Sequence, residues 1–165
     1  MNRIPTRAQA FTLCLTFALL SACSKPEVQQ TGGATSNLQT RAVTNGTFKF
    51  VNVFSGKVLE VAGGSLENGG RAQQYQDNGT KAQQWKLERG SDGSFKISNL
   101  NSGKVLDVNN ASTANGAVVQ QWQDYGTADQ RFILKELGAG VVSITAKHSG
   151  KVLELTDFSS DDGLL

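Results

Sequence analysis

Hydrophobic and polar residues alternate along two short stretches of the chain. The stretch "TFKFVNV" covers residues 47–53, and the stretch "SFKISNL" covers residues 94–100. This period of two residues is typical of β-strands that bury one face and expose the other. Ser-Gly, Asn-Gly and Asp-Gly pairs, which favour tight turns, separate the apolar stretches, and helical spacing does not persist for two turns beyond residue 47. The pattern therefore predicts an all-β domain.

A second pattern is superimposed on the first, because the chain repeats with a period of 47 residues. The strand "SGKVLEV" at 55–61 returns as "SGKVLDV" at 102–108 and as "SGKVLEL" at 149–155. A later aromatic position recurs at the same interval as Trp85 and Phe132. One copy cannot cover its own apolar face, whereas three copies around a common axis can close a small barrel with a shared core.

The first two copies also carry a Gln-x-aromatic element, which is Gln-Gln-Trp at 83–85 and Gln-Arg-Phe at 130–132. Together with the repeated "S-G-K-x-L-[DE]" strand, these elements resemble ricin B-type lectin domains, which have a β-trefoil fold. The resemblance covers residues 48–165. It implies three repeats, at 48–94, 95–141 and 142–165, of which the third is incomplete.

The third copy stops before its aromatic strand, because Leu165 aligns with Val118 of the second copy and with Arg71 of the first. Loss of one core aromatic side chain typically costs about 3–5 kcal/mol. That is a large part of an ordinary domain stability of about 5–15 kcal/mol. We therefore expect either that the sequence is a truncated version of a longer protein or that the domain is marginally stable as written.

The resemblance implies that each repeat can hold a shallow sugar site. An acid on the repeated strand accepts hydrogen bonds from sugar hydroxyls, an aromatic side chain stacks on the pyranose, and polar residues near the Gln-x-aromatic element complete the site. Ionised acceptors form the stronger hydrogen bonds, and an aromatic ring offers a flat apolar surface. In the second copy the matching residues are Asp107, Gln120, Trp122, Tyr125, Asp129 and Gln130.

The first copy carries a weaker version of this site. Its matching residues are Glu60, Gln73, Tyr75 and Asn78. Ala82 stands at the position that Asp129 holds in the second copy, and a Glu carboxylate reaches one methylene further than an Asp carboxylate. We expect both differences to weaken a contact with two hydroxyls. The third copy has Glu154 without an aromatic strand, so we expect it to be silent.

Several of these residues also have structural interpretations. Asp107 could instead cap a turn, and Trp122 could belong to the core, although its alternation with Gln121 favours exposure. Gln83 and Gln130 are expected mainly to brace backbone groups, and Gln130 is also a candidate ligand contact. Gln121 is predicted on the inward face, where its amide needs a hydrogen-bond partner that the sequence does not identify.

The N-terminal part of the chain has a different composition. Residues 1–22 contain two arginines and then an apolar run too short for a spanning helix, and they lead into Cys23 through "LSAC", which resembles a bacterial lipobox. We expect cleavage before Cys23, acylation of its thiol and anchoring to a lipid bilayer of the cell envelope. Ser24 is not the aspartate associated with inner-membrane retention, which favours the outer membrane in a Gram-negative host. Residues 23–47 are polar and non-periodic, which predicts a flexible linker.

Charge and side-chain chemistry exclude several function classes. Outside residues 1–22, the fourteen remaining basic residues balance the fourteen acidic ones, so the chain lacks the basic surface of a nucleic-acid-binding protein. The single histidine, His148, is expected in a solvent-exposed loop, and we predict no metal, cofactor or nucleophile elbow. Glu60 and Asp107 lie on separate repeats, too far apart for the two carboxylates of a glycosidase.

The sequence therefore predicts a non-catalytic, lectin-like module that is monomeric, binds a glycan or polysaccharide, and is held at the cell envelope through Cys23. Two alternatives remain open. The domain could be a trefoil scaffold that binds a protein partner. It could also be the targeting remnant of a larger glycoside hydrolase.

Overall fold

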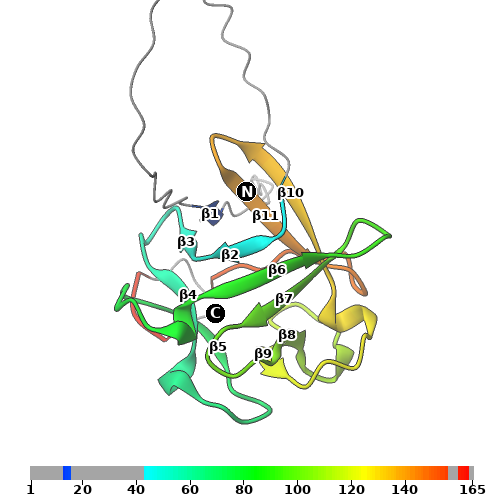
Figure 1. Cartoon of the computed structure of the whole chain (residues 1–165), viewed down its shortest axis with the longest axis horizontal. Coiled ribbons are helices and arrows are strands. Elements are labelled where there is room, and N and C mark those ends of the chain that lie inside the picture. Colours follow the sequence, from blue (N-terminus) through cyan, green and yellow to red (C-terminus); the bar gives the residue numbers. More distant parts are fainter. Residues whose placement is uncertain (1–12, 16–42, 156–159, 164–165) are drawn as a thin grey trace, which may run out of the picture.

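The computed structural model describes residues 13–15, 43–155 and 160–163, and this part of the chain consists of β-strands and short 3₁₀ turns (Figure 1). Lobe one contains β2 (Gly46–Phe48), β3 (Phe50–Asn52), β4 (Val58–Val61), β5 (Ala72–Tyr75) and β6 (Trp85–Arg89). Lobe two contains β7 (Phe95–Asn99), β8 (Val105–Val108), β9 (Val119–Trp122) and β10 (Phe132–Gly138). Lobe three contributes β11 (Val141–Ala146) and the residues after it, and β1 (Leu13–Leu15) lies beside β11. The 3₁₀ turns are η1 (Ala62–Gly64), η2 (Lys81–Gln83), η3 (Asn109–Ala111) and η4 (Ala128–Gln130).

The strands join in a pattern that repeats with the sequence. β6 pairs with β2 of its own lobe and with β7 of lobe two, and β10 pairs in the same way with β7 and β11. In lobes one and two, β4 pairs with β5 and β8 pairs with β9 as antiparallel hairpins. Each of the first two 47-residue repeats is thus one structural unit. The structure confirms the prediction of an all-β trefoil.

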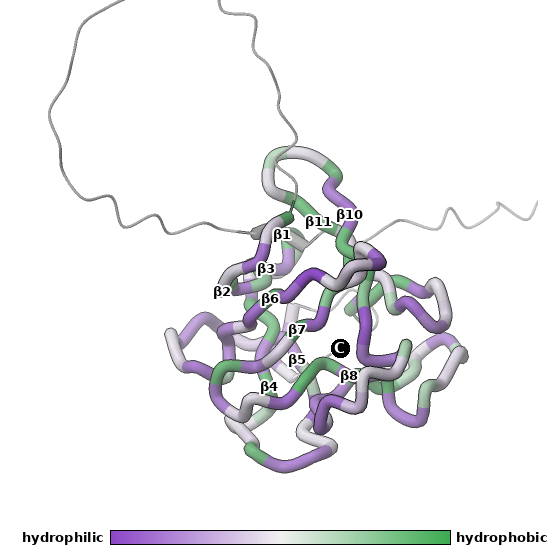
Figure 2. Tube along the Cα trace, turned by 45° about the vertical axis from the view of Figure 1, so that its right-hand side comes forward, coloured by the Kyte–Doolittle hydropathy of each residue, from purple (hydrophilic) through white to green (hydrophobic). Residues whose placement is uncertain are grey.

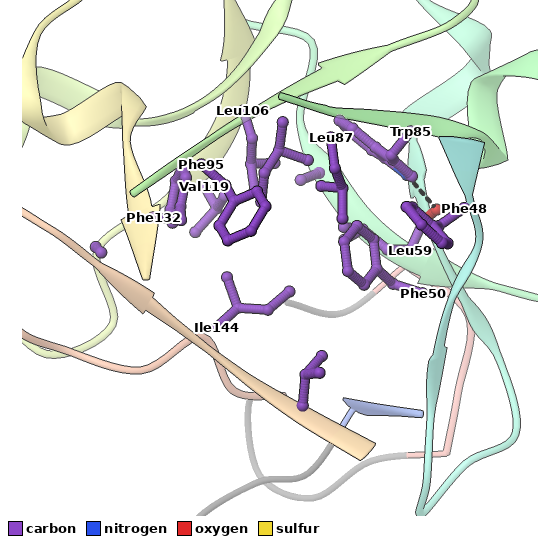
Figure 3. Close-up of a cluster of buried hydrophobic side chains, with 14 of the residues drawn as sticks. Phe48, Phe50, Leu59, Trp85, Leu87, Phe95, Leu106, Val119, Phe132 and Ile144 are labelled. Carbon is purple, nitrogen blue, oxygen red and sulfur yellow. Dashed lines mark hydrogen bonds between the residues drawn. The ribbon is translucent and has the colours of Figure 1, made fainter. Parts of the chain in front are cut away.

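The core lies where the strands of the lobes converge (Figure 3). Trp85 and Phe132 have no exposed surface, as expected for equivalent anchors, and Phe50 and Leu87 are buried equally well. The Trp85 indole N–H also donates a hydrogen bond to the backbone oxygen of Leu59 at 2.9 Å. Along the tube in Figure 2, hydrophobic and hydrophilic residues alternate, which is how short strands supply a core while keeping polar groups in water.

β1 occupies the position in lobe three that β6 and β10 occupy in the first two lobes. It lies between β3 and β11, with Leu13 opposite Val142 and Asn52. These partners are the threefold equivalents of the partners of Trp85 and Phe132. The pairing was not predicted, because β1 falls within the predicted leader. It gives the facing edges of β3 and β11 a strand partner, which an exposed sheet edge otherwise lacks.

The lobes are also tied together by buried glutamines. Gln121 Nε2 donates to the backbone oxygens of Ser65 at 2.8 Å and Glu67 at 2.9 Å, both in lobe one, and its Oε1 accepts from a serine hydroxyl at 2.6 Å. Gln74 forms the equivalent contact with lobe three, because its Nε2 donates to the backbone oxygen of Asp161 at 2.6 Å. These bonds identify the partners that an inward-facing Gln121 requires, and they join lobe two to lobe one and lobe one to lobe three.

The folded domain begins before residue 48. Val43 is buried in the core, and the side chain of Asn45 accepts a hydrogen bond from the Arg89 N–H at 2.8 Å. The last residues of the predicted linker therefore take part in the domain. Cys23, the rest of the linker and the predicted leader apart from β1 lie outside the described residues. Within the described ranges, no helix has the length and apolar character needed to cross a membrane.

Candidate functional site

A buried carboxylate in lobe two is held by two amide side chains. Asp107 lies within β8 and is 5% exposed. Its Oδ1 accepts from Gln120 Nε2 at 2.8 Å, and its Oδ2 accepts from Gln130 Nε2 at 3.0 Å. We call these three residues the amide bracket of lobe two. Asp107 therefore does not cap a turn; the bracket fixes the orientation of its carboxylate, and each oxygen has a second lone pair beyond these bonds.

Lobe one contains the same arrangement around a glutamate. Glu60 lies within β4 and is also 5% exposed. Its Oε1 accepts from Gln73 Nε2 at 2.8 Å, and its Oε2 accepts from Gln83 Nε2 at 2.9 Å. These residues form the amide bracket of lobe one. The extra methylene of Glu60 is thus accommodated with both carboxylate oxygens engaged.

The glutamine of the Gln-x-aromatic element holds backbone groups in place as well as the acid. Gln130 is 1% exposed, its amide also donates to the backbone oxygen of Gln123 at 2.9 Å, and its Oε1 accepts from the Tyr125 N–H at 2.8 Å. Gln83 forms the equivalent backbone bonds in lobe one. Both glutamines therefore brace backbone groups, as predicted, and Gln130 holds the loop that carries Tyr125 next to the carboxylate.

An aromatic side chain ends the strand next to each bracket. Trp122 ends β9 and Tyr75 ends β5, and both are half-buried. Trp122 lies outside the cluster of buried core residues, and its Cζ3 approaches lobe one so closely that a Cβ added to Gly69 would lie 3.7 Å away. Tyr125 is 64% exposed. These positions favour a surface platform over a core role for Trp122.

A pocket of about 450 Å³ opens beside the bracket of lobe one. Four predicted site residues line it together, namely Glu60, Gln73, Tyr75 and Asn78. Ala82, which replaces the polar residue of the second copy, lines it as well. The repeat predicted to hold the weaker site therefore has an open pocket that is lined by its carboxylate residue Glu60.

The predicted residues of lobe two come from three adjacent segments of the chain. They are Asp107 on β8, Gln120 and Trp122 on β9, and Tyr125, Asp129 and Gln130 on the loop and η4 that follow. Hydrogen bonds join the bracket residues directly, and Asp129 is half-buried in η4. This arrangement offers a charged acceptor, amide donors and an aromatic face. Over the described residues, no group of His, Cys, Asp and Glu side chains is arranged to hold a metal ion.

Two residues that were not predicted as site residues reach across a lobe boundary. Asn101 of lobe two lines the pocket of lobe one, and its Nδ2 donates to the backbone oxygen of Gly64 at 2.8 Å. His148 holds the equivalent position in lobe three, 47 residues later. The prediction of a solvent-exposed loop is wrong for His148, because its ring is half-buried and its Nε2 lies 2.9 Å from the backbone oxygen of Ser112 in lobe two. The repeat register relates these residues, but only the packing of the lobes shows what they contact.

Comparison with known families gives one match that covers most of the chain. A family model described as "Ricin-type beta-trefoil lectin domain-like" matches residues 34–122 and, in a second overlapping alignment, residues 81–164. Overlapping matches are expected when neighbouring repeats resemble one another. A comparison with curated proteins gave no match.

Solved structures share the fold. A designed threefold symmetric protein, ThreeFoil, is 41% identical with a TM-score of 0.70, and the match covers 72% of this chain and 84% of that one. An exo-β-1,3-galactanase from Clostridium thermocellum is 34% identical with a TM-score of 0.68, and the match covers 76% of this chain but 26% of the enzyme. The Rhizoctonia solani agglutinin is 21% identical with a TM-score of 0.65, covering 73% of this chain and 82% of that one, and is similar in fold alone.

Proposed function

The chain belongs to the ricin-type β-trefoil lectin domain-like family, and on this premise we propose that it is a carbohydrate-binding module with one sugar site in lobe one and one in lobe two. The observation that carries the proposal is the amide bracket, which occurs in both lobes beside a half-buried aromatic ring. The similar structures include a galactanase at 34% identity, and this context also supports a glycan as the ligand.

The bracket suits recognition of a polyol. A carboxylate whose orientation is already fixed accepts hydrogen bonds from ligand hydroxyls without a further ordering cost for its own side chain. Bonds to an ionised acceptor are shorter and stronger than bonds between neutral groups. Bound donors and acceptors also penalise the wrong epimer, because buried polar groups are then left unpaired. Tyr75 and Trp122 supply apolar surface for the face of the sugar ring.

The proposed activity is binding without catalysis. Each bracket holds a single acid, and the amides around Glu60 and Asp107 orient these carboxylates as acceptors. The hydrolase among the similar structures is about four times as long as the matched region, so its reaction is not transferred to this chain. A glycosidase needs two carboxyl groups within roughly 5–10 Å, and the two brackets belong to different lobes.

Shallow sites of this kind act together. A millimolar dissociation constant corresponds to only about 4 kcal/mol of binding free energy. Two sites on one domain, and many domains on one surface, raise the retention on a polysaccharide far above that of one site.

The lipobox-like sequence at Cys23 supports the presence of many domains on one surface, because acylation there would gather many copies on a cell-envelope membrane. Labelled palmitate should enter the wild-type protein, whereas the Cys23→Ala variant should remain unlabelled and leave the membrane fraction.

The sugar sites are tested by removing the aromatic platforms. Their removal disturbs the bracket less than removal of an acid would. Retention of the domain on a panel of immobilised polysaccharides should fall about tenfold or more in the Trp122→Ala/Tyr75→Ala double variant, because each ring contributes about 1 kcal/mol or more of apolar contact. Phe54→Ala is the matched control, since Phe54 is an aromatic residue, 63% exposed, that lies outside both sites. Unchanged retention of the double variant would end the proposal.

A protein-binding scaffold makes a different prediction in the same experiment. The double variant would then keep its partner in a pull-down from the host envelope fraction, while no polysaccharide would retain the wild-type domain. Asp107→Asn is a useful third variant, because it preserves the volume of the side chain while removing its charge. Loss of binding in Asp107→Asn with an unchanged unfolding temperature would attribute the effect to the ligand rather than to the fold.

A further inference from the structure

The pocket of lobe one is not built from lobe one alone. Asn101 lies in the turn between β7 and β8 of lobe two, yet it lines the pocket that contains Glu60 and Tyr75. Its Nδ2 is used in the 2.8 Å hydrogen bond to the Gly64 backbone oxygen, at the end of η1. The amide is thereby fixed at the rim of the pocket, and its Oδ1 is the part of the group that remains to accept a hydrogen bond.

At the equivalent boundary, between lobe two and lobe three, His148 takes the place of Asn101. His148 lies in the turn after β11 and contacts the Ser112 backbone oxygen, directly after η3, through Nε2 at 2.9 Å. Because a carbonyl oxygen only accepts, Nε2 must carry the proton of this bond. The other ring nitrogen, Nδ1, is buried and has no hydrogen-bond partner among the described residues. The carbonyl contact thus holds the imidazole against the turn that borders the bracket of lobe two.

We propose that each sugar site is completed by a rim residue from the following lobe, Asn101 for lobe one and His148 for lobe two, and that this residue makes the two sites differ in the sugars they select. The inference rests on the proposed function and adds to it a residue outside each repeat. Asn101 offers a hydrogen-bond acceptor to a hydroxyl or amide substituent of the sugar. His148 offers a larger, flatter and less polar edge, so lobe two favours ligands with an apolar group at the same place.

The residue at the same repeat position in lobe one provides a control within the molecule. Phe54 holds the position of Asn101 and His148 in lobe one, on the turn that faces lobe three, and it is 63% exposed. Among the described residues of lobe three, none is proposed here as an aromatic platform beside Glu154, and we propose sugar sites for lobes one and two only. A change at Phe54 therefore tests the position without touching a proposed ligand contact.

The experiment isolates one site at a time in the full chain. Asp107→Ala leaves only lobe one competent, and Glu60→Ala leaves only lobe two. Dissociation constants for galactose, N-acetylgalactosamine and their methyl glycosides are then measured by titration calorimetry or ligand-observed NMR. In these backgrounds, Asn101→Ala and His148→Ala should each weaken binding about three- to tenfold, the effect of losing one hydrogen bond or a comparable contact. Phe54→Ala should change neither site.

Exchanging the rim residues separates a ligand contact from a merely structural one. Asn101→His and His148→Asn both retain a group that can donate to the neighbouring carbonyl. The order of preference among the four sugars should therefore move toward that of the other lobe, while the unfolding temperature stays within a few degrees. Altered unfolding temperatures with unchanged preferences would overturn the rim assignment.

The outcome also distinguishes failure of this inference from failure of the proposed function. If the wild-type sites bind sugars and all rim variants bind them with the same constants, the rim assignment is wrong while the sugar sites stand. If neither site of the wild-type chain binds any sugar of a broad glycan panel, both proposals are wrong.

Discussion

Lobe one and lobe two hold an acid in the same bracket but surround it with different side chains. In both lobes, each carboxylate oxygen accepts one amide hydrogen bond of 2.8–3.0 Å, although one acid is Glu60 and the other is Asp107. Around these brackets, Tyr75 of lobe one is replaced by Trp122 of lobe two, and the rim position changes as well. The bracket is thus common to both lobes, and under the proposed function any difference in ligand choice between them comes from the residues around it.

A second difference separates the same two lobes at the base of the bracket. Ala82 is buried in lobe one, whereas Asp129 holds this position in lobe two and is half-buried. Asp129 adds a second carboxyl group directly before Gln130 of the bracket, and lobe one has no counterpart. Lobe two thus carries an additional hydrogen-bond acceptor at this position, whereas in lobe one the smaller Ala82 lines the pocket beside Glu60.

The largest effect on the free energy of unfolding is expected when either of the two core anchors is removed. Trp85→Ala and Phe132→Ala should each destabilise the domain by about 3–5 kcal/mol, because both side chains are fully buried. Trp85→Ala should lie at the upper end, since it also leaves the Leu59 carbonyl without its 2.9 Å donor. Urea unfolding followed by circular dichroism measures the difference. A larger loss in Phe132→Ala would show that the hydrogen bond of the Trp85 indole does not add to the stability of the core.

The next effect concerns the amides that hold the acids. Gln130→Leu leaves a carboxylate oxygen, a backbone oxygen and a backbone N–H without partners, and we expect a loss of about 2–3 kcal/mol. Gln83→Leu should cost the same, because it makes the equivalent bonds in lobe one. The neighbouring Gln84→Leu is the matched control, since its contacts are 3.3 and 3.4 Å long and exposed. Equal losses at all three positions would mean that the bracket has no special role in the fold.

Exchanging Glu and Asp tests whether each bracket is fitted to its own acid, and a smaller loss of stability is expected. Glu60→Asp should break one of the two amide bonds, because the shortened side chain cannot reach both Gln73 and Gln83, at a cost of about 1 kcal/mol. Asp107→Glu should cost a similar amount by crowding the bracket of lobe two. Thermal unfolding of both variants, together with sugar titration, measures the fit. If neither substitution changed the unfolding temperature or sugar binding, the length of the acid would not matter for the bracket.

The sequence was sufficient for those features that depend on the repeat alone. Trp85 and Phe132 occupy equivalent positions 47 residues apart, so a common core followed directly from their spacing. The four residues predicted for lobe one share a pocket for the same reason, since they belong to one β-hairpin, β4 and β5, and to the loop that follows it. Alternation within β9 also separated Trp122 from Gln121 correctly, as Gln121 is fully buried and Trp122 is not.

Contacts between lobes could not be predicted, because they depend on how the repeats pack. Gln121 finds its acceptors in lobe one, and His148 finds its acceptor in lobe two. No local pattern connects residues that are 36–56 positions apart. The pairing of Leu13 with β3 and β11 is of the same kind, since the apolar run that contains it has a sufficient explanation as a leader. Sequence periodicity therefore predicted the lobes and their acids, and the three-dimensional arrangement was needed for the sites between them.

The smallest expected effect lies in the turns that link one lobe to the next. Asp92, in the turn between β6 and β7, accepts hydrogen bonds from Lys147 Nζ at 2.5 Å and from the Ser94 hydroxyl at 2.7 Å, whereas the equivalent turn of lobe two carries Ala139. The Lys147 ammonium, with help from Ser94, lowers the pKa of the Asp92 carboxyl below its ordinary value. A group with a lowered pKa in the folded state stabilises above its unfolded pKa of about 3.9 and loses that contribution as the pH falls.

Asp92→Asn should therefore lower the unfolding temperature slightly at pH 7 and by less at pH 3, where the wild-type chain has lost part of the advantage. Both partners are exposed, so the difference at pH 7 should also shrink in 1 M salt, which screens charges beyond about 3 Å. Lys147→Gln should reproduce this behaviour, because it removes the cation while leaving the Ser94 bonds. A difference that is the same at pH 3 and pH 7 would show that the charge pair does not join lobe three to the first turn. The two linking turns would then be equivalent despite their different residues.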